Sequence, residues 1–342
     1  MLQARQPILR RFWYPVIPLD QLNGGPRAFT LLNTPLVLWL TGDGKPVAMR
    51  DRCCHRSARL SGGWIEDGHI VCPYHGWTYG ADGVLVRIPQ IAESGRNETI
   101  RVPSYRAAAR YGYVWVALDD PLTDIPDLPE AEAAGYRLIQ EFYEPWRCSA
   151  LRLMENSFDG AHLSYVHKSS FGDIKNPKPA DFTVEEFDGG FHLRSESQVR
   201  NPELGKKTTG SAEDVTTRRR HQTWFMPFCR KFKITYPNGL EQIIFTAATP
   251  IDDESIQVCQ FVVRNDTEAE VRAADVIAYD RQITGEDRVV LEGTDGDAPL
   301  DIARGGEFHM PSDKPGLLMR QHLSRLLAAH GESEVRRRTE AA

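Results

Sequence analysis

Cys53-Cys54-His55 and, after a gap of sixteen residues, Cys72-Pro73-Tyr74-His75 form the stretch that decides the fold of the first part of this chain. Thiolates and imidazoles are the side chains that bind transition metals and iron–sulfur clusters. Each half of the stretch supplies at least one cysteine and one histidine, so together they indicate a mixed four-ligand metal centre. Gly62, Gly63 and Gly76 beside the two halves allow backbone amides to approach such a centre closely.

Two kinds of centre fit this set of ligands. A Rieske-type [2Fe–2S] cluster takes two cysteines on one iron and two histidines on the other. Tetrahedral zinc is the alternative, but zinc modules usually place two cysteines in one short motif and two histidines in another. Because each half of this stretch has its own cysteine and its own histidine, the pattern favours the iron–sulfur cluster.

The pattern C-x-H followed by C-P-Y-H-G-W resembles the Rieske non-heme iron oxygenases. The residues behind its first half that carry the same resemblance are Arg56, Leu60, Ser61 and Gly62. The resemblance implies that the cluster is bound by Cys53, His55, Cys72 and His75. In the family, proline commonly occupies the position between the first cysteine and the histidine, where this chain has Cys54. We interpret Cys54 as a residue that does not bind the cluster, because free cysteines are often simply buried.

Length and composition predict about two soluble domains. The chain has 342 residues, of which 41% are hydrophobic and 26% charged. No apolar run approaches the ~20 residues of a membrane span, and Met1 to Phe12 lacks the apolar core of a secretory signal, so we expect a cytoplasmic protein without a membrane partner. The other cysteines are scattered and indicate no disulfide framework. A net charge of −6 gives no reason to expect nucleic acid.

The first domain, residues 1–128, is predicted to be all-β. Short strand-like runs cover residues 27–32, 36–40, 46–50, 84–87 and 113–117, and Asp82-Gly83 is a hairpin-turn signal. The Pro- and Asp-rich segment from Asp119 to Pro129 then indicates a linker. We expect the catalytic domain at residues 129–330 and a frayed tail at 331–342.

A second polar stretch, from Cys148 to His167, has a helical pattern. Asn156, Asp159 and His162 recur at intervals of three residues, which keeps them within one arc of a helix. His167 lies off that arc, so it joins His162 only if the helix is distorted or ends between them. A single histidine would be equally compatible with a core position. Two histidines and an acid in a chain that already has an electron-transfer cluster favour iron.

The segment from Glu155 to His167 resembles the N-x₂-D-x₂-H-x₄-H motif of the same oxygenases. The resemblance implies that His162 and His167 are iron ligands and that Asn156 and Asp159 are catalytic residues. Asp159 would bridge the mononuclear site to a Rieske histidine of the neighbouring subunit. A carboxylate that accepts hydrogen bonds from imidazoles fixes their orientation, which suits this role.

Two histidines need a carboxylate to complete the 2-His-1-carboxylate face of a non-heme Fe(II) site. A long helical pattern begins at Asp266 and Thr267 and runs to about Gly293, and most of its acids are expected to be solvated. Asp287 is followed three and four residues later by Val290 and Leu291, so it begins a row of residues that is expected to face the core. The surrounding segment from Gly285 to Val290 resembles the family segment that carries the ligand aspartate. We choose Asp287, with Glu286 as the alternative.

The fold class predicted for the whole chain is α+β. Strand-like runs cover residues 137–143, 182–187, 191–197, 222–225, 232–236, 242–247 and 256–263, joined by turns at Asp188-Gly189-Gly190 and Pro237-Asn238-Gly239. They predict one curved antiparallel sheet packed by helices, a helix-grip-like arrangement. Lys206 to Thr217, followed by three arginines, is expected to be a mobile lid or a solvated loop. An amphipathic helix is predicted near residues 317–327.

The resemblance implies a terminal oxygenase component, and the alternative is a Rieske electron carrier without oxygenase activity. The carrier leaves the second set of metal-ligand residues unexplained. An oxygenase of this family, whether a monooxygenase or a dioxygenase, would use O₂ and would receive electrons from NAD(P)H through a reductase or ferredoxin. It would form a homotrimer. Its substrate would be a small aromatic or cyclic compound that is hydroxylated or demethylated, while Arg87-Ile88-Pro89-Gln90 also resembles the branch that acts on tetrapyrroles. The aromatic residues that could line a pocket or belong to the core are Phe158, Phe171, Trp224 and Phe225, together with Met226.

Overall fold

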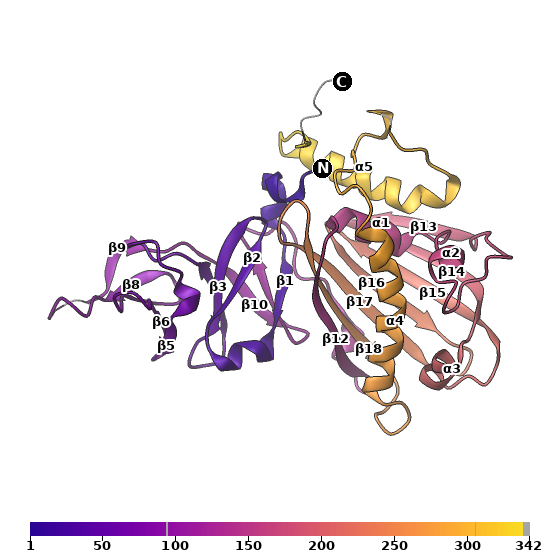
Figure 1. Cartoon of the computed structure of the whole chain (residues 1–342), viewed down its shortest axis with the longest axis horizontal. Helices are drawn as coiled ribbons and strands as arrows, with labels where there is room; N and C mark the ends of the chain where they lie inside the picture. The colour runs from indigo at the N-terminus through magenta and orange to yellow at the C-terminus, as the bar shows by residue number, and fades with distance from the viewer. Residues whose placement is uncertain (94, 305, 338–342) are drawn as a thin grey trace. The chain divides into compact units, whose positions relative to one another are not determined.

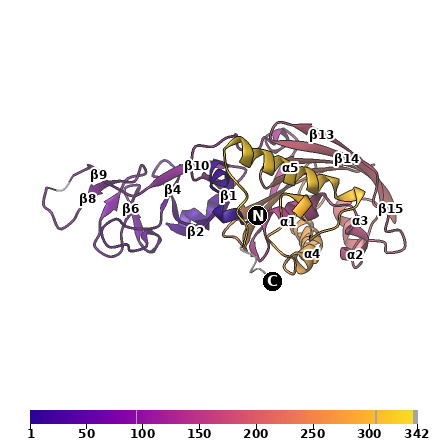
Figure 2. The ribbon, with the colours of Figure 1, turned by 90° about the horizontal axis from the view of Figure 1, so that it is seen from above.

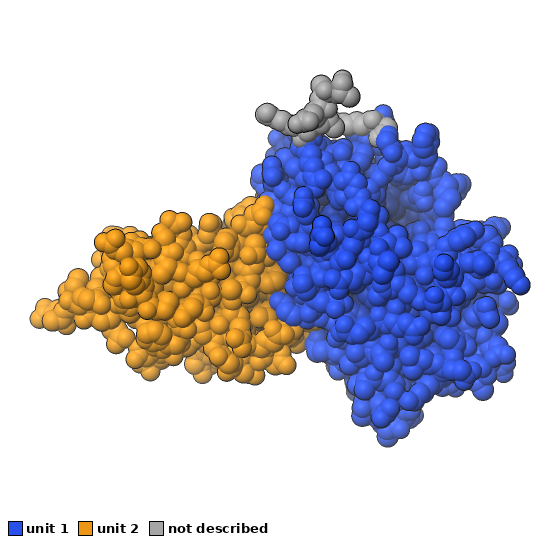
Figure 3. Space-filling view, in the orientation of Figure 1, with its two compact units in different colours: residues 1–8, 126–342 blue, residues 9–125 orange. Residues whose placement is uncertain are grey.

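The structure is a computed structural model that describes residues 1–93, 95–304 and 306–337. The chain divides into two compact units, which Figure 3 shows in different colours. The smaller unit is Leu9–Ile125, and the larger combines Met1–Ile8 with Pro126–Ala342. The division after Ile125 lies near the expected boundary at residue 128, but the first eight residues were expected in the other domain.

The smaller unit contains two antiparallel sheets and no α-helix among its described residues. The six-stranded sheet has the order β1-β11-β10-β4-β3-β2 and the five-stranded sheet the order β5-β6-β7-β8-β9 (Figure 1). The strands are β1 (Tyr14–Pro18), β2 (Arg27–Leu31), β3 (Thr34–Leu40), β4 (Pro46–Arg50), β5 (Trp64–Glu66), β6 (His69–Val71), β7 (Thr78–Tyr79), β8 (Val84–Arg87), β9 (Asn97–Arg101), β10 (Ser104–Arg110) and β11 (Tyr113–Ala117). The prediction of an all-β fold here is confirmed.

One core joins the two sheets of the smaller unit. Trp39 and Met49 from the first sheet pack in the same buried cluster as Tyr79 and Leu85 from the second. Cys53 and Cys72 belong to this cluster, with 2% and 1% of their surfaces exposed. Both thiols therefore point into a desolvated interior rather than to the surface.

The larger unit is built on one antiparallel seven-stranded sheet, which confirms the predicted fold class. The order is β12-β18-β17-β16-β15-β14-β13. The strands are β12 (Arg137–Trp146), β13 (Phe182–Phe187), β14 (Gly190–Arg200), β15 (Val215–Phe225), β16 (Cys229–Thr235), β17 (Glu241–Pro250) and β18 (Ile256–Arg264). The two predicted turns are present, and Gly189 and Gly239 take the positive φ angles of +86° and +88° that favour glycine.

Five α-helices accompany this sheet in the described part of the chain: α1 (Ala150–Phe158), α2 (Leu163–Val166), α3 (Glu203–Thr209), α4 (Ala273–Leu291) and α5 (Lys314–Ala329). Helix α1 contacts β16 and β17, and α4 contacts α1, α2, α3 and β12. Figures 1 and 2 show α1 and α4 on the same side of the sheet. None of the described helices is both long and apolar enough to cross a membrane.

Helix α4 begins later than its sequence pattern predicts. Thr267 donates its backbone N–H to Glu270 over 2.8 Å, and the Thr267 hydroxyl accepts from the Glu270 N–H, so Thr267 caps a separate turn ahead of the helix. The acids of α4 are also less solvated than expected. Asp280 is 4% exposed and accepts a hydrogen bond from Gln242.

The segment from Lys206 to Thr217 is not an irregular loop, as the sequence analysis expected. Its first part belongs to α3, in which Thr208 and Thr209 are buried, and its last part belongs to β15. The Thr208 carbonyl accepts a 2.7 Å hydrogen bond from the buried Arg264 guanidinium. This contact holds the end of α3 against the sheet, which the Gly- and Thr-rich composition does not reveal.

The two ends of the described chain lie together in the larger unit. The Met1 amino group lies 2.7 Å from Asp297 Oδ1, and the Arg336 guanidinium lies 2.8 Å from the same oxygen. Leu2 donates its N–H to the Val335 carbonyl over 2.8 Å. These contacts place Met1–Ile8 in the larger unit. They also correct the expectation of a frayed tail for residues 331–337, while 338–342 lie outside the described residues.

Replacing Arg320 by alanine should destabilise the larger unit by about 3 kcal/mol, because the largely buried Glu155 and Glu307 then share the single positive charge of Arg152. The Arg320 side chain, 3% exposed on α5, donates to Glu155 on α1 over 2.5 Å and lies 2.7 Å from Glu307. Arg325→Ala on the same helix is the matched control. Arg325 is 63% exposed and 3.7 Å from Glu186, so its loss should cost less than ~0.5 kcal/mol. Urea unfolding of both variants tests this, and equal costs would contradict it.

Candidate functional site

The two loops with the cysteine–histidine pairs share one backbone hydrogen-bond pattern. Cys53 donates its N–H to the Ala58 carbonyl, five residues later, and its own carbonyl accepts from Ser57. Cys72 donates to Trp77, also five residues later, and accepts from Gly76. Cys53 and Cys72 are therefore equivalent positions, which Cys54 and Cys72 are not.

Positive backbone φ angles occur at the same place in both turns. Ser57 has φ +59° and Gly76 has φ +71°, and each lies four residues after its cysteine. A positive φ turns the chain back so that the following backbone closes around the cysteine. The Asp51 carboxylate braces the first loop by accepting from the Ser61 N–H over 2.8 Å and from its hydroxyl over 2.6 Å.

The side chains of the two loops are sorted by ligand type. The thiols of Cys53 and Cys72 are buried, and burial raises the pKa of the Cys72 thiol. The His55 and His75 rings are more accessible and lie 4.6 Å apart between centroids, and His55 stacks on Trp77 at 4.5 Å. Two inner thiols and two outer imidazoles fit a cluster with cysteines on one iron and histidines on the other.

Cys54 is exposed, yet its sulfur shares a neighbour with the buried Cys53. The Tyr79 hydroxyl lies 3.1 Å from Cys53 Sγ and 3.1 Å from Cys54 Sγ. Cys53→Ala should therefore abolish the visible cluster absorption, while Cys54→Ala should retain it. Absorption and circular dichroism spectra of the two purified variants check this assignment. If Cys54→Ala lost the absorption and Cys53→Ala retained it, the cluster ligand would be Cys54 instead of Cys53.

The second site begins where α1 ends. Asp159 follows α1 with an extended backbone, and its carboxylate accepts from the Ala161 N–H over 2.8 Å and from the His162 N–H over 3.0 Å. Such side-chain capping competes with helix continuation. His162 and His167 then flank the single turn of α2, so the predicted continuous helix is wrong, whereas the condition that the helix ends between the two histidines is met.

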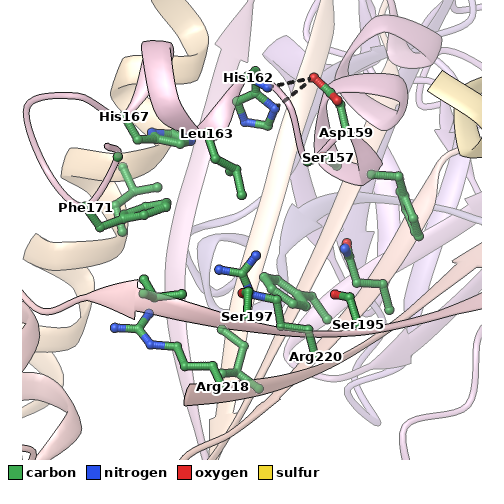
Figure 4. A pocket seen from close by; sticks show the side chains of 18 of the residues that line it. Ser157, Asp159, His162, Leu163, His167, Phe171, Ser195, Ser197, Arg218 and Arg220 are labelled. Carbon is green, nitrogen blue, oxygen red and sulfur yellow. Dashed lines mark hydrogen bonds and ion pairs between the residues drawn. The ribbon is translucent and has the colours of Figure 1, made fainter. Parts of the chain in front are cut away.

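The structure brings His162, His167 and Asp287 together (Figure 4 shows both histidines). Asp287 Oδ1 lies 3.4 Å from His162 Nε2 and 3.3 Å from His167 Nε2. Neither contact has hydrogen-bond geometry, so this buried oxygen has no hydrogen-bond partner in the described structure. Two ring nitrogens and one carboxylate oxygen that converge in this way fit a bound divalent metal.

Further carboxylates hold the outer nitrogens of both rings. His167 Nδ1 lies 2.8 Å from Glu286, which also accepts from the Ser170 hydroxyl, and His162 Nδ1 lies 3.3 Å from Asp159. Metal-bound histidines typically have such partners, which fix the ring orientation. Glu286, the alternative to Asp287 in the sequence analysis, thus contacts the far side of His167.

Electrostatics also favour a cation at this site. Burial acts to raise the pKa of Asp287, but the contacts with His162 and His167 outweigh it and hold that pKa well below its usual range. Burial acts to lower the pKa of His162, but Asp159 and Asp287 raise it to about 9. The carboxylate is thus ionised at neutral pH, and the site attracts positive charge.

A cavity of about 640 Å³ opens beside these residues, between the sheet and helices α1, α2 and α4. This volume suits a small organic ligand. Asn156, Asp159, His162, His167 and Asp287 all line it. Of the aromatic candidates, Phe158 and Phe171 line the cavity, whereas Trp224 lies in the core, packed against Phe191 and His322.

The arginines of this cavity were not predicted from the sequence. Arg218 and Arg220 of β15 and Arg230 of β16 all line it. Arg218 and Arg220 lie two residues apart on a strand, and they therefore share the face that the buried Gln222 continues. The alternation of β15 carries this signal, but the predicted strand began only at Gln222.

Comparison with known proteins identifies the families that the two parts of the chain match. Residues 12–106 match the Rieske [2Fe-2S] domain family, and residues 146–329 match the vanillate O-demethylase oxygenase C-terminal domain. The chain is 30% identical to methylxanthine N1-demethylase NdmA of Pseudomonas putida over 97% of its own length and 93% of the relative's. It is 33% identical to the oxygenase component of dicamba O-demethylase of Stenotrophomonas maltophilia, over 47% of this chain and 48% of that one.

The fold comparison covers the whole architecture. The solved structure of Pseudomonas putida NdmA has a TM-score of 0.81 and 28% sequence identity, over 96% of this chain and 93% of that one. The matched oxygenase domain favours an enzyme over the electron carrier. The chain therefore belongs to the Rieske non-heme iron oxygenases, as a catalytic alpha subunit of their demethylase branch.

Proposed function

We propose that this oxygenase binds a mononuclear Fe(II) through His162, His167 and Asp287, and its Rieske cluster through Cys53, His55, Cys72 and His75. The observation that carries the first assignment is the buried Asp287 Oδ1, which has no hydrogen-bond partner although two histidine Nε2 atoms face it. The shared turn of Cys53 and Cys72 supports the second.

The bound iron supplies the activation of O₂ for attack on an organic substrate. The protein supplies the geometry around it. Glu286 and Asp159 hold the Nδ1 atoms of the two histidines, so that both Nε2 atoms face Asp287. The cavity is large enough for a small substrate beside these atoms.

Electrons are proposed to come from NAD(P)H through a reductase or ferredoxin. We propose a cytoplasmic location, where NAD(P)H and such redox partners are present. Asp159 keeps 26% of its side chain exposed, so its carboxylate can accept a hydrogen bond from outside the subunit while it holds His162. We assign Asp159 as the bridge to a Rieske histidine of a neighbouring subunit, with Asn156 beside it on the cavity wall. Such head-to-tail contacts close into a ring, and the proposed ring is a homotrimer.

The proposed reaction is hydroxylation or oxidative demethylation of a small aromatic or cyclic compound. Two relatives support this class, since one is a methylxanthine N-demethylase and the other belongs to an O-demethylase. In demethylation, hydroxylation of a methyl carbon on nitrogen or oxygen gives an unstable product that releases formaldehyde. Monooxygenation is therefore favoured over dioxygenation.

Metal analysis combined with turnover tests this function. The purified protein should contain three irons and two acid-labile sulfides per chain, and with a matched reductase it should consume O₂ and release formaldehyde from a methylated aromatic substrate. Labelled O₂ should place its oxygen in the product. Two irons per chain with fast cluster reduction and no product in any assay would instead indicate an electron carrier.

A further inference from the structure

Two arginines of β15 lie opposite two serines of β14 on the cavity wall. In the antiparallel register Arg220 pairs with Ser195, and Arg218 pairs with Ser197. All four side chains line the cavity. Figure 4 shows them on the sheet side, with His162, His167 and Asp159 across the cavity. Because serine is much smaller than arginine, each pair leaves space above the serine beside a guanidinium group.

Arg220 has no charged partner. No described carboxylate lies within ion-pair distance of it, and its buried Nε has no hydrogen-bond partner. Burial and the nearby charge of Arg218 lower the pKa of Arg220 to about 10, so the group is still charged at neutral pH. Arg220 is partly buried as a residue, and its Nε atom is fully buried. A largely desolvated, unpaired cation is costly, and proteins generally keep one only where something neutralises it.

The neighbouring arginines differ from Arg220 because each is already engaged. Arg218 donates to Asn201 over 2.5 Å and lies over the Tyr236 ring. Arg230 donates to the Ser157 carbonyl over 2.9 Å and is influenced by the charges of Asp287 and Asp280. The fully buried Arg264, outside the cavity lining, is paired with Asp266. Among these arginines, Arg220 is thus the one for which the described structure shows neither a hydrogen-bond acceptor nor a carboxylate.

The acids that line the cavity are engaged as well. Asp159 and Asp287 face the two histidines, and Asp173 accepts from Asn176 and from the Lys175 N–H. Asp280 accepts from Gln242, and burial together with the charge of Asp280 raises the pKa of the neighbouring Glu141 well above its usual range. The charge that would neutralise Arg220 is therefore not supplied by the described residues of the cavity.

Ser197 adds a second unused polar group. Its Oγ atom is buried and lacks a hydrogen-bond partner in the part of the chain that the structure describes. A hydroxyl can donate to an anionic oxygen, and a guanidinium presents a planar set of donors that matches a carboxylate or sulfonate. The two groups lie on neighbouring strands and two residues apart in register, because Arg220 pairs with Ser195 and Arg218 with Ser197.

We propose that the substrate is an aromatic or cyclic organic acid whose carboxylate or sulfonate binds to Arg220 and Ser197, with the ring directed across the cavity toward His162, His167 and Asp287. That the bound acid is then oxidised rests on the proposed function. That an anion binds at Arg220 and Ser197 does not depend on it. A neutral analogue of the same shape would leave Arg220 unpaired, so the site discriminates by charge rather than by size.

Calorimetric titration of the anaerobic holoenzyme with matched pairs tests the proposal. The pairs are para-methoxybenzoate with para-methoxybenzamide, and para-methoxybenzenesulfonate with its sulfonamide. In the wild type at least one acid should bind about tenfold or more tightly than its neutral partner. Comparing the pairs distinguishes carboxylate from sulfonate recognition. Equal affinities of acids and neutral partners, or acetate and sulfate binding as tightly as the aromatic acids, would overturn the proposal.

Variants identify the residue responsible. Arg220→Gln should remove the preference for acids, and Arg220→Lys should retain part of it, because lysine keeps the charge but loses the planar set of donors. Arg219→Gln is the matched control, since Arg219 is the next residue, is 81% exposed and faces Glu196. It should bind as the wild type does. A preference for acids that survives in correctly folded Arg220→Gln would overturn the assignment, and the wild-type comparison stands even if that variant does not fold.

The result is separable from the test of the proposed function. Binding is measured without turnover, so an acid preference that depends on Arg220 stands even if the protein lacks the third iron or yields no product. Conversely, three irons and O₂-dependent product from neutral compounds, together with no acid preference, would leave the oxygenase function intact and reject the anion site.

Discussion

Asp287→Ala should reduce the iron content from three to two atoms per chain and abolish turnover, while the visible spectrum of the cluster stays unchanged. Asp287 supplies the oxygen on which His162 Nε2 and His167 Nε2 converge, and without it only two ligands remain. His162→Ala and His167→Ala should behave in the same way. Iron analysis, cluster absorption and product formation under single-turnover conditions measure the three effects separately.

The neighbouring Glu286 provides the control. Glu286→Gln keeps the size of the side chain and an oxygen to accept from His167 Nδ1, so it should lower metal affinity by about 10–100-fold rather than remove the site. If Asp287→Ala retained full iron and activity while Glu286→Gln lost both, the carboxylate ligand would be Glu286.

Asp159→Asn should preserve both metal centres and slow the oxidation of the reduced cluster severely. Asparagine keeps the size of the side chain and one acceptor oxygen, but it removes the charge that faces His162. Rapid mixing of prereduced protein with O₂ and substrate measures the rate at which the cluster spectrum returns. Ser164→Ala is a suitable control, because its hydroxyl contacts the Asn176 carbonyl rather than a histidine.

Mixed oligomers test whether electrons cross between subunits. A His75→Ala chain has no intact cluster and an Asp287→Ala chain has no mononuclear iron, so each alone should be inactive. When the two are coassembled, some interfaces pair an intact cluster with an intact iron site, and partial activity should return. Full turnover by a monomer, or no recovery in verified mixed oligomers, would reject electron delivery across the interface.

The proposed ligand residues could be chosen from the sequence because they lie in short motifs with fixed spacing. His162 and His167 are five residues apart, and Asp287 stands in a segment that resembles the family. The break between α1 and α2 was not predicted, although Asp159-Gly160 is a turn signal, because the repeat of Asn156, Asp159 and His162 fits a continuous helix equally well.

Other features depend on contacts between distant parts of the chain. Glu286 differs from a solvated helix acid only because it meets His167, 119 residues away. The run Arg218-Arg219-Arg220 looks like an exposed basic loop in sequence, yet the sheet places Arg219 outside, buries Arg218 and partly buries Arg220. Short strands such as β5 and β6 have three residues each, too few to show a period.

The repeated turn around Cys53 and Cys72 bears on how the two loops keep their shape. The hydrogen bonds that shape these loops run from backbone to backbone within each loop, and the Asp51 brace is also protein alone, so none of them requires iron or sulfide. Zinc fingers, by contrast, fold only when the metal arrives. The two loops are therefore held in shape by the polypeptide itself, and the contacts that close each turn also arrange the side chains that we propose as cluster ligands.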